Sequence, residues 1–202
     1  MNVFIKRLFD IIAIDIVHLS SYLSSSQQQY LDNNLKSIND LDNDLYTDEE
    51  GENLEVLLHF LTCHKNEIIQ LWNNPSSKAI LVSLYTSSII SGNYDCFHFD
   101  LSKFNATYNP VGQKLTLYRV GRSGETTESL GNSWSKTHNG IKNYVQSSTI
   151  DGLNRPIFEA EVSDTEVLCE GNPQEDELIL KKGFSLEKCR QLVENEQFDI
   201  LQ

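Results

Sequence analysis

The spacing of apolar residues changes near residue 93 of this 202-residue chain, and this change constrains the fold more than any other feature of the sequence. Up to that point apolar side chains such as Phe4 and Leu8 recur every three or four residues, which is typical of helices that bury one face. After Tyr94, short alternating runs are separated by Gly, Asn, Ser and Pro, which is typical of strands. The sequence therefore predicts an α+β protein with a helical N-terminal region, residues 1–93, and a second domain, residues 94–202.

The periodic stretches also predict individual elements. Thr47 and Glu50 form a capping box at the start of a helix that Asn73 and the following Asn-Pro pair end. The predicted helices of the first region span residues 4–22, 48–73 and 78–90. The predicted strands of the second domain span residues 113–121, 155–163, 165–169 and 176–182, with short helices predicted at 135–148 and 185–196.

The charge of the chain bears on its partners. Sixteen basic and 29 acidic side chains give a net charge of -13, and both regions share the excess of acid. Such a chain repels a phosphate backbone and lacks the attraction that drives non-specific binding to nucleic acid. Asp10, Asp15 and His18 interrupt the apolar N-terminal run, so we expect no membrane span and no signal peptide.

The cysteines indicate neither a metal site nor a disulfide framework. They are far apart in the sequence and form no Cys-x-x-Cys pair: Cys63, Cys96, Cys169 and Cys189. A reducing environment suits this pattern, so we expect a cytoplasmic protein that needs no metal.

Two glutamates flank an aspartate at the head of the apolar run that ends the strand-rich part. If Glu175 to Glu177 lie in a strand, the two glutamates share one face and Asp176 points to the other. Two carboxylates held this close raise the pKa of one of them, which suits a group that takes a proton from a substrate. Glu175 and Glu177 are therefore candidate catalytic residues, and Asp176 is expected to be dispensable.

Two other motifs precede this one, and the three together resemble a known family. Tyr118-Arg119 ends a predicted strand, and a Ser-x-Ser element follows at Ser133 to Ser135. In this order, over residues 113–184, the motifs resemble the Arg-Ser-Glu, cholera-toxin-like class of mono-ADP-ribosyltransferases. The resemblance implies a mixed, mainly antiparallel two-sheet core at residues 94–202 that binds NAD as its substrate.

The resemblance also implies roles for these residues. Breaking the bond between nicotinamide and ribose develops positive charge on the sugar, so a carboxylate beside the sugar stabilises the transition state. Glu177 is expected in that role, assisted by Glu175, while the guanidinium of Arg119 is expected to grip the diphosphate through bidentate hydrogen bonds. The remaining expected NAD-binding residues are Tyr118, Ser133, Trp134 and Ser135, with the Trp134 ring packed on nicotinamide.

Three functions stay open at this stage. The chain is expected to transfer ADP-ribose to a protein side chain or a nucleobase, as a bacterial or phage toxin or defence effector with a neutralising or chaperone protein as partner. The same site would instead hydrolyse NAD if no acceptor is held near Glu175. A non-catalytic interaction module would bind no NAD, with Arg119 at a strand edge and the glutamates serving solubility.

Overall fold

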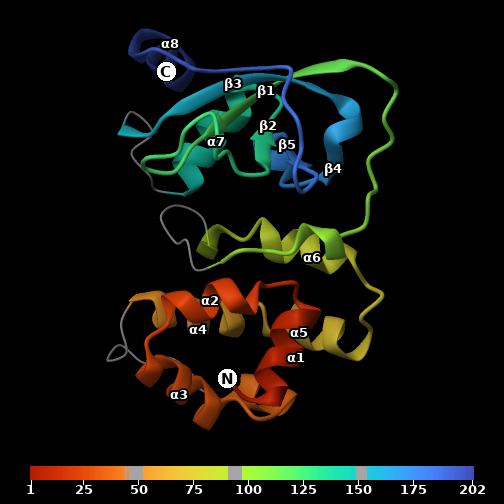
Figure 1. Cartoon of the computed structure of the whole chain (residues 1–202), viewed down its shortest axis with the longest axis vertical. Helices are drawn as coiled ribbons and strands as arrows, with labels where there is room; N and C mark the ends of the chain where they lie inside the picture. Colours follow the sequence, from red (N-terminus) through yellow and green to blue (C-terminus); the bar gives the residue numbers. More distant parts are fainter. Residues whose placement is uncertain (44, 46–51, 91–96, 149–153) are drawn as a thin grey trace. The chain divides into compact units, whose positions relative to one another are not determined.

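The computed structural model describes residues 1–43, 45, 52–90, 97–148 and 154–202. It divides into two compact units, Met1–Phe104 and Asn105–Gln202 (Figure 1). This division falls later than the expected boundary at residue 93. The reason is that the segment before residue 104 is tied to the helical unit: Phe99 pairs with Ile14 in an isolated β-bridge. The expected capping box at residues 47–50 lies outside the described residues.

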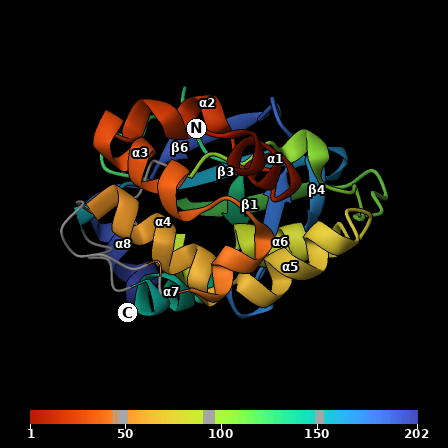
Figure 2. The ribbon, with the colours of Figure 1, turned by 90° about the horizontal axis from the view of Figure 1, so that it is seen from below.

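The helical unit contains short helices whose boundaries differ from the sequence pattern. They are α1 (Val3–Ile11), α2 (Ile16–Tyr22), α3 (Ser25–Asn34), η1 (Ile38–Asp42), α4 (Glu52–Cys63), α5 (Lys65–Asn73), α6 (Ala79–Tyr85), η2 (Ser88–Ile90) and η3 (Leu101–Lys103). The expected single helix over residues 4–22 is interrupted because Ala13 takes a left-handed conformation (φ 61°). In Figure 2, α1 and α2 are the two red helices on either side of this break. None of the helices in the described ranges has the length and apolar character needed to cross a membrane.

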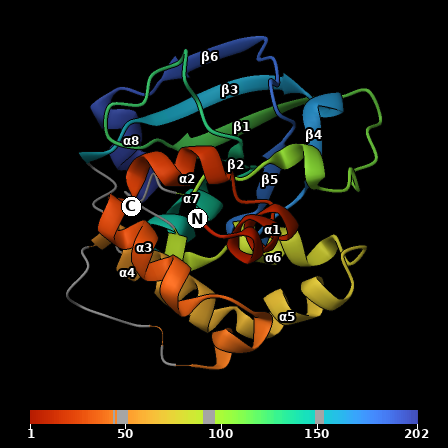
Figure 3. The same cartoon turned by 60° about the horizontal axis from the view of Figure 1, so that its bottom comes forward.

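The second unit is built on one antiparallel sheet of six strands. The strands are β1 (Lys114–Val120), β2 (Ser133–Ser135), β3 (Ile157–Ser163), β4 (Val167–Glu170), β5 (Glu177–Leu180) and β6 (Lys188–Gln191). Their order across the sheet is β4-β5-β2-β1-β3-β6, which Figure 3 displays from one edge to the other. The α+β class is therefore confirmed, whereas the described strands form a single sheet and not the expected two. β2 joins them because it pairs with both β1 and β5.

The two faces of the sheet carry different apolar clusters. The first face carries the larger core, in which Leu117, Trp134, Phe158 and Leu178 are buried together. On the second face, α7 (His138–Ser147) and α8 (Glu194–Leu201) pack on a smaller cluster. Short 3-10 turns precede β4 and β5, namely η5 (Asp164–Glu166) and η6 (Pro173–Glu175). We call the two surfaces the core face and the helix face.

The expected helix over residues 185–196 is wrong. Lys188–Gln191 instead forms the edge strand β6 against β3, and α8 begins only at Glu194. Pairing across the two strands explains the preference, because Arg190 lies opposite Glu159 and their side chains form an ion pair at 2.6 Å. Tertiary contacts of this kind override a local helical pattern.

Candidate active site

Strand pairing aligns the three motifs across the middle of the sheet. β5, β2 and β1 are neighbours, and Tyr118 lies opposite Ser135, which lies opposite Glu177. Directly opposed residues of antiparallel strands share a face. Tyr118, Ser133, Ser135 and Glu177 therefore all point to the helix face, although they come from segments far apart in the sequence.

Glu177 is held by two donors at the start of β5. The Ser133 hydroxyl donates a short hydrogen bond to one of its carboxylate oxygens, and the Asn172 backbone N–H donates to the other at 2.7 Å. Burial raises the pKa of Glu177, while these two donors and the positive charge of Arg119 act in the opposite direction. The side chain is nearly enclosed, so its carboxylate has one fixed orientation.

Glu175 reaches the same place without being in the strand. It ends the η6 turn, and Asp176 then adopts a left-handed conformation (φ 48°), so the expected continuous strand through both glutamates is wrong. Asn172 brings the two carboxylates together, because its side-chain amide donates to Glu175 at 2.9 Å while its backbone binds Glu177. Burial first, and the Glu177 charge second, raise the pKa of Glu175 to about 7.

Asp176 has a structural contact that the sequence pattern did not indicate. The Thr137 hydroxyl donates to its carboxylate at 2.6 Å, and the Lys136 N–H donates to its carbonyl at 3.0 Å. Thr137 is also the N-cap of α7. Asp176 therefore fastens the start of α7 to the turn that carries Glu175.

The side chain of Arg119 points to the opposite face of the sheet, the core face. It pairs with Phe158 of the core face, on the same side of β1 as Leu117. Its guanidinium reaches the end of β2, where Nη1 donates to the Ser133 carbonyl at 2.8 Å. Arg119 and Glu177 thus meet the same residue, Ser133, from the two sides of the sheet.

The guanidinium of Arg119 forms a bidentate ion pair with the carboxylate of Glu125. Nε and Nη2 donate to the two oxygens of Glu125 at 3.0 and 3.1 Å, so with Ser133 three of the five N–H groups of the guanidinium are engaged within the protein. The two side chains are only 11% and 6% exposed. The expected bidentate grip on a diphosphate therefore has a carboxylate in its place.

The other expected NAD-binding residues occupy three different positions. Tyr118 packs edge-on against His138 of α7, with ring centroids 4.4 Å apart, and is partly buried. The Ser135 hydroxyl lies within hydrogen-bonding distance of the Glu175 carbonyl, at 2.8 Å. Trp134 is 1% exposed on the core face, where its indole N–H donates to the Gly131 carbonyl, so its ring is not available to pack on nicotinamide.

Sequence reasoning missed the residues that position this group. Asn172 precedes a proline and caps the η6 turn, a signal for a turn that the sequence does carry. Glu125 lies in a polar loop with no local pattern, and only its contacts in the folded loop, with Arg119 and Gly131, reveal its role. Among the described residues no group of His, Cys, Asp and Glu side chains is arranged to hold a metal ion.

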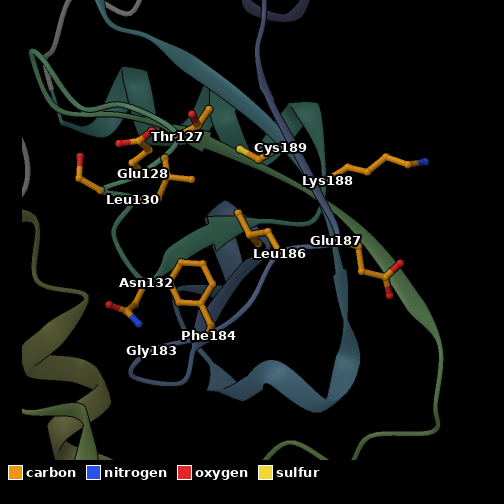
Figure 4. Close-up of a pocket in the computed structure, with 11 residues that line it drawn as sticks. Thr127, Glu128, Leu130, Asn132, Gly183, Phe184, Leu186, Glu187, Lys188 and Cys189 are labelled. Atoms are coloured by element: carbon orange, nitrogen blue, oxygen red, sulfur yellow. The ribbon is translucent and has the colours of Figure 1, made fainter.

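A pocket of about 480 Å³ lies elsewhere on the sheet unit. The loop at residues 127–132, the loop that begins at Gly183 and the start of β6 line it, and Phe184 and Leu186 pack against the core-face cluster (Figure 4). Neither Glu175 nor Glu177 lines this pocket. The candidate site therefore consists of the two carboxylates and their donors, away from this pocket.

The arrangement can stabilise a cation and accept a proton. Glu177 is fixed and close to a serine hydroxyl, as a group that stabilises developing positive charge should be. Glu175 is near half-protonation at neutral pH, as a general base should be.

Comparison of the chain with protein-family models, with curated proteins and with solved structures finds no match.

Proposed function

We propose that this protein transfers ADP-ribose from NAD to a macromolecular acceptor. The observation that carries the proposal is the convergence of Ser133, Glu175 and Glu177 on the helix face, from the two motifs in which the sequence resembles mono-ADP-ribosyltransferases. Arg119, from the Tyr118-Arg119 motif, contributes to the same site from the core face, where it donates to the Ser133 carbonyl.

The reaction gives each carboxylate a different task. The bond between ribose C1′ and the nicotinamide nitrogen breaks, and its electron pair leaves with nicotinamide. Glu177 stabilises the cationic sugar while the acceptor nucleophile forms a bond to C1′. Glu175 takes the proton that the acceptor loses.

Labelled NAD tests the proposal directly. Incubated with cell extract, the protein should place labelled ADP-ribose on a macromolecule, and digestion of separate portions with protease and nuclease identifies the acceptor class. Glu177→Gln should lower the rate roughly 100- to 1,000-fold, whereas Glu194→Gln, an exposed change on α8, should not. Label found only as free ADP-ribose would indicate an NAD hydrolase, and no binding of NAD would favour an interaction module.

A further inference from the structure

Glu125 fastens both ends of the loop that joins β1 to β2. Besides the Arg119 fork, its carboxylate accepts the backbone N–H of Arg122 at 2.6 Å and of Gly131 at 2.7 Å. Burial would raise the pKa of Glu125, but the Arg119 charge and these N–H donors outweigh it and lower the pKa. The carboxylate therefore stays charged and fully bonded at neutral pH.

Two glycines of the loop lie close to the ion pair. A Cβ atom at Gly131 would lie 2.4 Å from Nη2 of Arg119, and one at Gly121 would lie 3.1 Å from a Glu125 oxygen. A side chain at either position would therefore displace the guanidinium or the carboxylate from its present place. The guanidinium is thereby pressed against β2, where it donates to the Ser133 carbonyl.

We propose that Glu125 is a positioning residue for the transfer reaction, acting through Arg119 and Ser133 on the carboxylate of Glu177. Glu125 holds the guanidinium, the guanidinium holds the backbone of Ser133, and the Ser133 hydroxyl orients Glu177. This role rests on the proposed function. In this role of Glu125, Arg119 holds the backbone of Ser133 from the core face and is not a ligand of the diphosphate.

Steady-state kinetics with NAD separates these two roles of Arg119. Glu125→Gln keeps the size of the side chain and removes its charge, so the guanidinium loses its anchor and kcat should fall about 100-fold, the cost of a misplaced catalytic group, with KM for NAD little changed. Glu125→Asp keeps the charge and should recover part of kcat. Glu128→Gln, an exposed change in the same loop, is the matched control.

The opposite pattern would overturn the proposal. If Glu125 merely blocks a diphosphate site on Arg119, Glu125→Gln frees the fork and lowers KM for NAD. An unchanged kcat in Glu125→Gln would contradict positioning equally. Should Glu125→Gln fail to fold, Glu125→Asp and Arg119→Lys decide, because both distort the fork and should each reduce kcat.

A second readout does not depend on turnover. If wild type consumes no NAD, the proposed function fails, yet carboxyl NMR titration still tests the link from Glu125 to Glu177. In Glu125→Gln the Arg119 charge is no longer held in place, so the pKa of Glu177 should rise above its wild-type value. A titration of Glu177 identical in the two proteins would show that Glu125 does not position this group.

Discussion

At the scale of single residues, Glu175 owes its raised pKa of about 7 first to burial and then to the charge of Glu177. The sequence suggested only the second cause. Its hydrogen bonds to Ser147 and Asn172 favour the charged form but do not cancel the rise. The group is therefore poised to gain and lose a proton near neutral pH.

The raised pKa of Glu175 predicts the pH dependence of the proposed transfer reaction. Because the base must be deprotonated, the wild-type rate should rise through about pH 7 and then level off. Glu175→Gln should lose this rise and lower the rate about 100-fold or more, as expected when a general base is removed. Rates measured from pH 5.5 to 8.5 for both proteins check it, and an unchanged profile in Glu175→Gln would show that another group is the base.

The raised pKa of Glu175 also makes the stability of the folded protein depend on pH. The folded-state pKa of Glu175 lies above its unfolded value of 4.5, so its stabilisation is complete below that value and is lost as pH rises through about 7. Glutamine resembles the protonated form, so Glu175→Gln should gain stability relative to wild type over this window. Since solvent reaches part of the carboxyl, we expect a gain on the order of 1 kcal/mol in urea denaturation at pH 8.

At the scale of elements, the sequence predicted the strands better than the ends of the helices. The run at 113–121 forms β1 and the run at 155–163 forms β3, because alternation with period two marks a half-buried strand directly. The helix predicted over residues 185–196 became β6 because cross-strand partners, which no local pattern contains, decided it. The break at Ala13 likewise depends on pairing with a distant segment.

The candidate site was predictable to the same extent. Ser133 and Glu177 were identified because their strands carry clear motifs. Arg119 was expected to bind NAD together with Tyr118, but alternation along β1 puts Arg119 with Leu117, on the side away from Tyr118. The partner of Arg119 could not be predicted, since Glu125 meets it only after the loop closes. Glu175 lies in the η6 turn and not in the predicted strand, because the Asn172-Pro173 turn precedes it.

The docking of α7 beside the site gives an element-scale prediction. A Cβ atom at Gly140 would lie 2.1 Å from both the Glu175 carbonyl oxygen and the Ser135 hydroxyl, so α7 approaches η6 as closely as glycine allows. Gly140→Ala should therefore destabilise the sheet unit by about 1–3 kcal/mol through overpacking, although alanine favours a helix. Thermal and urea denaturation measure the change.

Asn139→Ala supplies the control in the same helix. Asn139 is exposed, so this substitution changes helix propensity without meeting the turn, and it should be neutral or slightly stabilising. The two alanine substitutions should thus have opposite signs. A stabilised Gly140→Ala protein would mean that α7 is not held against the turn that carries Glu175.

At the scale of the whole molecule, both units are acidic, with formal net charges of -8 for residues 1–104 and -5 for residues 105–202. Neither unit therefore attracts a polyanion over long range. If the acceptor is a nucleobase, local contacts must supply the recognition that a basic surface gives other proteins. A basic protein surface, in contrast, would be drawn to either unit.

The division into two units predicts that residues 105–202 fold without the N-terminal helical unit. Both apolar clusters of the sheet are made only of residues from this unit, and 98 residues suffice for an independent domain. We expect the isolated fragment to unfold cooperatively with a stability of about 5 kcal/mol, as measured by circular dichroism in urea. Phe158→Ala, which opens the core face, should cost about 3–5 kcal/mol and leave the fragment only marginally stable. A wild-type fragment without a cooperative transition would show that the sheet needs residues 1–104 to fold.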